Sequence, residues 1–244
     1  MTTNTPSIDV RRKDQHFHTR TGWLDSRHCF SFGYHYDPEN THHGLLLVSN
    51  DDVVKPFTGF DIHPHRDMEI VTWVLDGELE HKDTLGNKGL IYPGLAQRMS
   101  AGRGIYHSEK NNTSPKDVHF VQMWVLPDTE SIDPGYEQLD INPELGRGGL
   151  VPIASGKGHQ AAISIRQKGA VLWGGRLKAG EAVRVPDAPF VHLYVARGAA
   201  KLEGVGLLNE GDAARLTEAG SPVLTTDADR GAEVLIWEMD PLRR

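Results

Sequence analysis

The stretch GFDIHPHRDME, residues 59–69, places two histidines, His63 and His65, two positions apart in the chain. Side chains at positions i and i+2 of a β-strand point to the same face of the sheet, and the residue between them points away. Pro64 would therefore face outward while the two imidazoles converge. Neutral imidazoles are common ligands of transition metals, so the pattern predicts one half of a metal site.

A second stretch with the same spacing follows later in the chain. The segment GRGIYHSE, residues 102–109, carries His107 and Glu109 with Ser108 between them. On two neighbouring strands, the three imidazoles and the carboxylate would surround one borderline divalent cation. A six-coordinate cation would keep positions open for water, substrate or dioxygen. The pattern therefore favours a catalytic metal site over a closed structural one.

Length and composition describe an ordinary globular protein. The 244 residues are enough for one large domain or two smaller ones, and hydrophobic residues make up 38% of them and charged residues 24%. The 26 glycines and 14 prolines predict many turns, as in all-β folds. A formal net charge of −7 without a basic patch argues against direct binding to nucleic acid.

Cysteine content and hydropathy indicate the cellular compartment of the protein. The single cysteine, Cys29, excludes an intramolecular disulfide and suits a reducing compartment. Residues 1–20 are polar and lack the apolar region of a signal peptide. No apolar run approaches the length of a membrane span. We therefore expect a cytoplasmic protein without a membrane partner.

Two domains built mainly of strands are predicted. Strand-like runs separated by turn residues recur along the chain, for example at Cys29–Tyr34 and Val118–Leu126. No window shows a sustained 3.6-residue apolar period, so any helices should be short. Residues 131–149 are polar and rich in proline and glycine, and they form the expected linker. An N-terminal metal-binding domain would then cover residues 1–130, and a C-terminal domain residues 150–244.

The two halves of the chain align as a degenerate repeat. The segment VTWVLDGELE, residues 71–80, aligns with HLYVARGAAK, residues 192–201. On this alignment the positions of the four candidate ligands fall, in order, at Arg184, Pro186, Thr225 and Asp227. Because the C-terminal half retains no histidine ligand, we expect one metal ion per chain, in the N-terminal half.

Several motifs closely resemble the pirin family, most strongly over residues 16–127. They are HCFSFGYHYDP at residues 28–38, HPHRDMEIVT at 63–72, LDGELEHKD at 75–83 and MSAGRGIYHSE at 99–109. The resemblance implies an all-β bicupin, in which two tandem cupin domains each form an antiparallel jelly-roll β-barrel. The C-terminal domain would be a degenerate cupin without metal ligands.

The resemblance also implies a metal and an activity. The family's metal is usually iron, so one Fe(II) ion is expected at His63, His65, His107 and Glu109, with Zn, Mn, Ni, Co or Cu as substitutes. Several bacterial members are described as quercetin 2,3-dioxygenases. This predicts a metal-dependent dioxygenase that cleaves flavonol-type aromatics such as quercetin with O2. Glu109 would be catalytic as the general base for the flavonol hydroxyl, and the metal would act as a Lewis acid.

Two other functions stay open at this point. The eukaryotic namesake of the family acts as a transcriptional co-regulator, so the chain could be a metal-containing regulatory or redox-sensing module that binds a protein partner. It could also be an oxygen-independent cupin metalloenzyme. Turnover measured with and without oxygen separates the two enzyme classes. A partner whose binding depends on the metal would favour the regulator.

Other histidines and a further glutamate have predicted places around this site. Glu69 is the candidate to accept a proton from a ligand imidazole and fix its tautomer, with direct metal binding as the alternative. His28 and His119 are expected at strand edges, and His192 in the core. The histidines expected to be solvated are His16, His18, His42, His43 and His81.

The strand Val118–Leu126 is expected to supply the wall of the substrate pocket. Its alternating side chains fall into two sets that face opposite ways. Either set could line the interior of the barrel, and the sequence does not distinguish them. The pocket-lining candidates are Phe120, Gln122 and Trp124 on one face and Met123 on the other.

Overall fold

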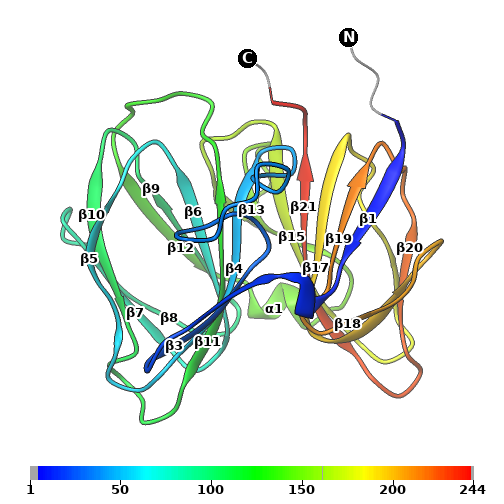
Figure 1. Cartoon of the computed structure of the whole chain (residues 1–244), viewed down its shortest axis with the longest axis horizontal. Coiled ribbons are helices and arrows are strands. Elements are labelled where there is room, and N and C mark those ends of the chain that lie inside the picture. The colour runs from blue at the N-terminus through cyan, green and yellow to red at the C-terminus, as the bar shows by residue number, and fades with distance from the viewer. Residues whose placement is uncertain (1–4, 161, 243–244) are drawn as a thin grey trace.

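The computed structural model describes residues 5–160 and 162–242, which fold mainly into β-strands. Two barrels lie side by side, with the N-terminal barrel at the left and the C-terminal barrel at the right of Figure 1. The all-β class and the two-barrel architecture are thereby confirmed. Residues 1–4, 161 and 243–244, which the predicted domain ranges include, lie outside the described residues.

The N-terminal barrel is built from two antiparallel sheets that face each other. One sheet has the strand order β12-β9-β6-β11-β4-β3-β2, and the other has the order β5-β10-β7-β8. The first comprises β2 (Phe17–Arg20), β3 (Leu24–His28), β4 (Leu46–Val54), β6 (Glu69–Asp76), β9 (Leu95–Ser100), β11 (Val118–Val125) and β12 (Gly135–Asp140). The second comprises β5 (Gly59–His65), β7 (Leu79–Asp83), β8 (Lys88–Ile91) and β10 (Ile105–Lys110).

The C-terminal barrel is organised around one long strand, β17. The first part of β17 pairs with β19 and β21, and its last part pairs with β18 and β20, so the strand runs through both layers. The main sheet has the order β1-β19-β17-β21-β15-β13-β14. Its strands are β1 (Ser7–Arg11), β13 (Val151–Ser155), β14 (Ile163–Ser164), β15 (Ala170–Leu177), β17 (Phe190–Leu202), β19 (Ala213–Thr217) and β21 (Ala232–Met239). The other layer holds β16 (Ala182–Arg184), β18 (Gly206–Asn209) and β20 (Val223–Thr226).

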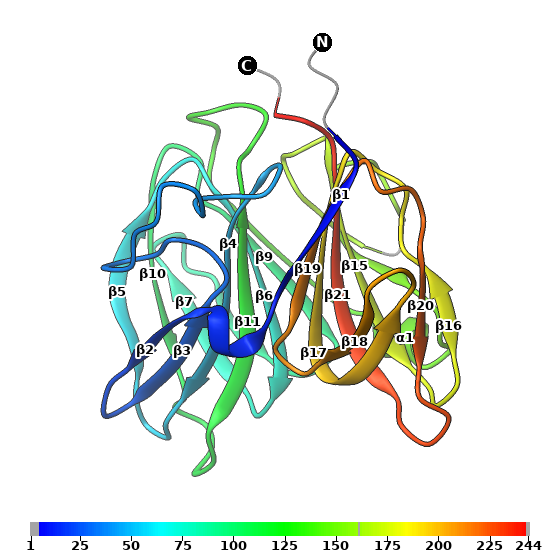
Figure 2. The ribbon, with the colours of Figure 1, turned by 45° about the vertical axis from the view of Figure 1, so that its right-hand side comes forward.

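The first strand of the chain belongs to the second barrel. Strand β1 pairs with β19, and its Ile8 and Val10 pack against the C-terminal core. The chain then passes through the 3-10 helix η1 (Lys13–Gln15) and enters the N-terminal barrel at β2, as Figure 2 shows. The predicted N-terminal domain range therefore includes a strand that completes the other barrel. The boundaries at residues 130 and 150 stay a prediction.

The predicted linker carries regular structure. Within residues 131–149, strand β12 extends the N-terminal sheet by pairing with β9. The short helix α1 (Asn142–Leu145) follows, and its Leu145 is buried in the core between the barrels. A polar strand at a sheet edge has one exposed side, which is why its composition resembled that of a linker. Within the described chain, neither helix is long and apolar enough to cross a membrane.

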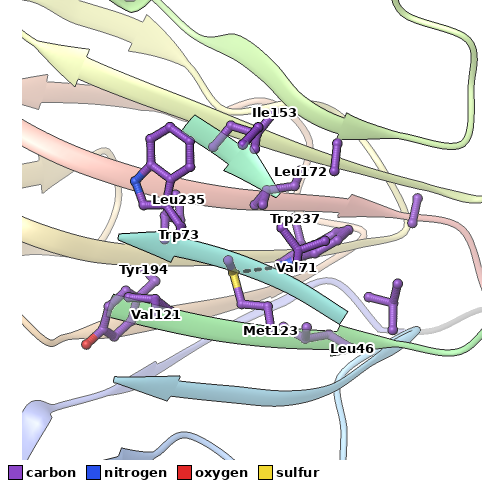
Figure 3. Close-up of a cluster of buried hydrophobic side chains, with 14 of the residues drawn as sticks. Leu46, Val71, Trp73, Val121, Met123, Ile153, Leu172, Tyr194, Leu235 and Trp237 are labelled. Atoms are coloured by element: carbon purple, nitrogen blue, oxygen red, sulfur yellow. Dashed lines mark hydrogen bonds between the residues drawn. The ribbon is translucent and has the colours of Figure 1, made fainter. Parts of the chain in front are cut away.

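A shared apolar core joins the two barrels. It packs β6 and β11 of the first barrel against β15, β17 and β21 of the second (Figure 3). The indole Nε1 of Trp237 lies 3.2 Å from the sulfur of Met123, across the boundary. Residues 69–75 of β6 are all buried, because one face lies against the other barrel and the opposite face lines the barrel interior. Labelled members of this core are Leu46, Val71, Trp73, Val121, Met123, Ile153, Leu172, Tyr194, Leu235 and Trp237.

Candidate metal centre

Three of the predicted ligands meet between strands β5 and β10. These strands pair antiparallel, with His63 opposite His107 and His65 opposite Ile105. The ring centroid of His107 lies 4.4 Å from that of His63 and 4.9 Å from that of His65. Their candidate donor nitrogens lie within 4.8 Å of one another. The intervening Pro64 is exposed, as the alternation of a strand requires.

A β-bulge sets the direction of the site's side chains. The register between β10 and β5 shifts between His107 and Glu109, so that Glu109 pairs with Phe60. Two residues of β5, Asp61 and Ile62, therefore lie opposite one residue of β10. Phe60 and His63 are three positions apart and would face opposite ways in a regular strand. Both line the same cavity here, because the extra residue reverses the alternation.

The nitrogens of the three imidazoles suit a bound cation. Nε2 of His65 and Nε2 of His107 are buried and have no hydrogen-bond partner. Nδ1 of His63 lies 2.7 Å from the backbone carbonyl of Asp61, and a carbonyl can only accept. Nδ1 of His63 therefore carries the proton and Nε2 keeps its lone pair. Buried acceptors without partners are rare, and a ligated cation would satisfy them.

Burial, together with the neighbouring imidazoles, keeps two members of this cluster neutral. These effects lower the pKa of His65 to about 4 and that of His107 to about 3. A neutral imidazole is the form that binds a metal, so little proton competition opposes binding near neutral pH. Nitrogen donors with one carboxylate suit borderline transition metals, and the residues present therefore fit the cation that the sequence predicts.

The carboxylate of Glu109 lies near the histidine cluster, and hydrogen bonds fix its orientation. Its side chain is 2% exposed, and the amide nitrogen of Gln122 donates to both carboxylate oxygens, at 2.9 and 2.8 Å. Nε1 of Trp124 donates to Oε1 of Gln122 at 3.1 Å, which fixes the orientation of the amide. An oxygen of Glu109 lies within 4.8 Å of donor nitrogens of His107 and His81. His107 thus belongs to two groups of possible donors, one with His63 and His65 and the other with His81 and Glu109. His63, His65 and Glu109 line the same cavity.

His81 is buried and supports His107, although it was predicted to be solvated. It is 0% exposed, and its Nδ1 lies 3.4 Å from Nδ1 of His107. Its Nε2 lies 3.3 Å from a carboxylate oxygen of Asp83. Donation from His81 Nε2 to Asp83 leaves Nδ1 of His81 as an acceptor. Nδ1 of His107 then carries a proton and Nε2 of His107 stays free for a cation.

The buried carboxylate of Asp83 has several donors of its own. The backbone amides of Leu85 and Asn87 donate to one of its oxygens at 2.9 and 3.0 Å. The side-chain amide of Asn87 donates to the other oxygen at 2.9 Å. Tyr136 of β12 lies against the ring of His81, with ring centroids 4.9 Å apart. The spacing of His81 and Asp83, two positions apart on one strand, was the signal that could have identified this pair.

The structure does not place Glu69 at the metal site, so both predicted roles of this residue are wrong. Its carboxylate oxygen Oε2 accepts hydrogen bonds from the hydroxyl of Ser100 and the backbone amide of Arg166, both at 2.9 Å. Glu69 shares the face of β6 with Trp73, which packs toward the second barrel. The opposite face presents Thr72, whose hydroxyl lies 3.5 Å from Glu109. The alternation of β6 separates Glu69 from the ligands.

A cavity of about 270 Å³ opens beside the histidines. Gln122 and Trp124 line it, so the face of β11 that carries them is the inner one. Phe120 shares this face but lies in the apolar floor, and Met123 points into the core between the barrels. The apolar side chains around the cavity are Leu24, Phe32, Phe60 and Trp124. This set suits a planar aromatic ligand.

The loop after β3 covers part of this cavity. The predicted strand Cys29–Tyr34 is wrong, because the sheet ends at His28 and the chain turns over the barrel. The ring of Phe32 lies 5.1 Å from that of His28 and meets Trp124 edge-on at 5.5 Å. The hydroxyl of Ser31 donates to the backbone carbonyl of Asp37 at 2.9 Å and closes the loop. His28 itself is buried and lines the cavity, and is not an edge residue.

The fold and this cavity together define a bicupin, with the histidine cluster in the first of two tandem barrels. Residues 10–125 match the family model described as Pirin, and residues 152–239 match the model described as Quercetinase C-terminal cupin domain. The chain therefore belongs to the pirin family. The resemblance stated from the motifs is thereby confirmed.

Similar proteins extend over nearly the whole chain. A putative quercetin 2,3-dioxygenase of Mycobacterium tuberculosis is 58% identical over 236 residues, which is 96% of each chain. A quercetin 2,3-dioxygenase of Escherichia coli is 34% identical over 236 residues, covering 96% of this chain and 100% of that one. The solved structure of the bacterial pirin YhhW from Escherichia coli with nickel(II) superposes with a TM-score of 0.88. It is 33% identical and covers 97% of this chain and 100% of its own. A metal is thus present in a close structural relative.

Proposed function

We propose that this protein is a metal-dependent dioxygenase that cleaves flavonol-type aromatics such as quercetin with O2. The observation that carries the proposal is the cluster of three histidines at an apolar cavity. Two of its imidazoles, His65 and His107, have buried Nε2 atoms without a partner. The names given to the relatives support the same substrate class.

We propose one divalent cation per chain, Fe(II), held by the Nε2 atoms of His63, His65 and His107 and by the carboxylate of Glu109. When bound, this cation would supply Lewis-acid stabilisation of a substrate oxygen anion and the means to react with dioxygen. Gln122 holds the carboxylate in place through both oxygens. His81 and Asp83 hold His107 in the tautomer that presents Nε2.

The cavity walls would bind and orient the substrate. Phe32, Phe60 and Trp124 offer aromatic surfaces to a planar ring system and exclude water from it. The flavonol hydroxyl has to lose its proton before its oxygen becomes an anion. Two carboxylates line the cavity, Glu109 and Asp52, and both are candidates to accept that proton. Glu109 is the acceptor that the sequence predicts.

Metal analysis combined with an oxygen-consumption assay tests the proposal. Protein purified from its own host should contain about one metal ion per chain, and quercetin should cause oxygen uptake with release of carbon monoxide. The variant His63→Ala should lose both properties, whereas the control His18→Ala should keep them, because His18 bonds Asp25 outside the cavity. Absence of oxygen uptake with any flavonol would contradict the proposal. Turnover that continues without oxygen would indicate the oxygen-independent class.

A further inference from the structure

A second carboxylate, that of Asp52, lines the cavity from strand β4. It is 3% exposed and lies opposite Phe120, in the apolar floor that also contains Val54 and Val74. The hydroxyl of Ser26 on β3 donates to it. Within residues 5–160 and 162–242, no lysine, arginine or histidine forms an ion pair with Asp52. A buried carboxyl without a cationic partner has no structural reason to be charged, which suggests a chemical role.

A line of hydrogen-bonding groups leads from Asp52 along the cavity wall to the loop after β3. The hydroxyl of Ser26 lies 3.4 Å from Nδ1 of His28. Nε2 of His28 lies 3.0 Å from the hydroxyl of Thr19, which lies 2.9 Å from Nε2 of His35. His35 is half-buried and lies on the loop after β3, against the ring of Phe17. The line therefore connects a buried carboxylate with the surface.

Every member of this line can both donate and accept a hydrogen bond. A hydroxyl group holds one proton and two lone pairs, and a neutral imidazole has one donor nitrogen and one acceptor nitrogen. His28 can therefore take up a proton at Nδ1 and release another from Nε2. Burial lowers the pKa of His28, so the neutral form that this exchange needs is the resting form.

We propose that Asp52 is the proton acceptor for the substrate hydroxyl, and that Ser26, His28, Thr19 and His35 carry this proton to solvent. In this step the hydroxyl O–H bond breaks and its electron pair stays on the substrate oxygen. The proton binds the carboxylate of Asp52 and then moves along the line, and no electron is transferred. This inference rests on the proposed function, and it assigns to Asp52 the role that the sequence predicts for Glu109.

Hydrogen bonding favours Asp52 over Glu109 as the acceptor. Both oxygens of Glu109 already accept from Gln122, and a bound cation would withdraw further charge from this carboxylate. Asp52 accepts one hydrogen bond, from Ser26, and has a defined route for passing the proton on. A proton taken up by Glu109 has no such route among the described hydrogen bonds.

The surroundings of Asp52 also give it a useful basicity. The pKa of Asp52 is raised to about 7, mainly by burial and also by the charges of Asp51 and Glu109. The hydrogen bond from Ser26 and the charge of His119 oppose it. Other titratable groups that line the cavity are His28 of β3, His63 and His65 of β5, and Glu109 of β10. A general base is most effective when its pKa lies near the working pH.

An infrared titration tests Asp52 without any turnover. In metal-free protein the carboxyl stretching band of a protonated, buried aspartate should titrate near pH 7. The same titration of metal-loaded protein shows how far a cation displaces it downward. The band should be missing from Asp52→Asn, while circular dichroism shows that the variant is folded. An unchanged band in folded Asp52→Asn would overturn the assignment.

Kinetics with quercetin as the probe test the route itself. Asp52→Asn should lower kcat by roughly 10²–10⁴-fold and remove the dependence on a group that titrates near neutrality. Thr19→Val removes a hydroxyl at nearly constant volume and should slow proton release to bulk solvent when quercetin binds without oxygen. Thr19→Ser keeps the hydroxyl and should restore the release. The control His18→Gln alters a neighbouring histidine of β2 outside the line and should change neither measurement.

The outcomes separate this inference from the proposed function. Wild-type protein that binds quercetin and releases a proton but consumes no oxygen would contradict the dioxygenase proposal and leave the proton route supported. Asp52→Asn with wild-type turnover, pH profile and proton release would overturn the route. If Glu109→Gln abolishes proton release while its metal content is preserved, and Asp52→Asn does not, Glu109 is the acceptor and the inference is wrong.

Discussion

The side-chain amide of Gln122 donates to both carboxylate oxygens of Glu109, at 2.9 and 2.8 Å. The two residues come from opposite sheets of the barrel, β11 and β10, so this contact connects the two walls of the cavity. Trp124 fixes the amide from the other side, and its ring meets His65 edge-on at a centroid distance of 4.8 Å. One row of inward side chains on β11 thus supports both the carboxylate and an imidazole of the candidate metal site.

Replacing Gln122 should therefore weaken metal binding. In Gln122→Leu the carboxylate of Glu109 loses its orienting donor, and we expect affinity for Fe(II) or Ni(II) to fall about 10–100-fold. Competition with a chelator of known affinity measures the change. Gln138→Leu, an exposed glutamine on β12, is the control. Equal affinities of the two variants would show that Gln122 does not position the ligand.

The pair His81 and Asp83 should act in the same way on His107. We expect His81→Ala and Asp83→Asn each to reduce metal affinity about 10–100-fold, because the tautomer of His107 is no longer fixed. The double variant should lose little more than either single one, because both act through one hydrogen-bonded line. If the losses of metal affinity in the two single variants add in the double variant, His81 and Asp83 act independently of each other.

The ligand histidines themselves should be essential for binding but not for folding. His63→Ala and His107→Ala are each expected to abolish metal binding, because each removes a nitrogen that would coordinate the metal directly. The circular dichroism spectrum should stay that of the wild type, since the apolar cores of both barrels lie outside the cluster. Wild-type metal content in either variant, measured by elemental analysis, would show that the proposed ligand set is wrong.

Glu69 should affect stability and leave the metal site unchanged. In Glu69→Ala the hydroxyl of Ser100 and the backbone amide of Arg166 lose their acceptor between the barrels. We expect the free energy of unfolding to fall by about 1–3 kcal/mol, the cost of buried donors left unpaired. Metal affinity should equal that of the wild type. A large loss of metal affinity without loss of stability would return Glu69 to the metal site.

The pair formed by His119 and Asp51 should make stability depend on pH. Their side chains lie 2.6 Å apart, and the hydroxyl of Tyr194 from the second barrel also donates to Asp51. Burial alone would lower the pKa of His119, but the hydrogen bond and charge of Asp51 outweigh it and raise that pKa. Burial would raise the pKa of Asp51, but the same partners hold it below its usual value. Both shifts stabilise the charged pair.

The sign of each shift defines the pH window. The contribution of Asp51 is present above the ordinary aspartate pKa of about 3.9 and is lost as the pH falls through its lowered value. The contribution of His119 is present below about pH 6.5 and is lost as the pH rises through its raised value. Asp51→Asn should therefore lower the free energy of unfolding more at pH 6 than at pH 9. The expected loss at pH 6 is about 1.5–3 kcal/mol. Equal losses at both values, from urea denaturation, would contradict the assigned pair.

The sequence alone determined the fold class and the faces of the ligand strands. The spacing of His63 and His65, and of His107 and Glu109, predicts convergence because side chains alternate with a period of two residues along any strand. The sequence also showed that the C-terminal half of the chain has no histidine at the corresponding positions. These features depend only on local geometry and on which residues the chain contains.

The sequence could not place residues whose strand is buried on both faces. On β6 and β11, one face lines the cavity and the other packs against the second barrel, so apolar and polar side chains occur on both. Tertiary packing decided that Gln122 and Thr72 face the cavity while Met123 and Glu69 face the other barrel. Because neither face of these strands is solvated, the alternation of polar and apolar residues does not indicate which face lines the cavity.

Tertiary structure also decided the roles of single polar residues. His81 and Asp52 stand among polar neighbours in the sequence, yet both are buried where two sheets close over them. Their function depends on which groups from distant strands lie beside them, and a side chain's burial and pKa follow from those neighbours. The sequence thus identified the candidate metal ligands. Only the folded barrel decided which neighbours orient those groups and which carboxylate can pass a proton to solvent.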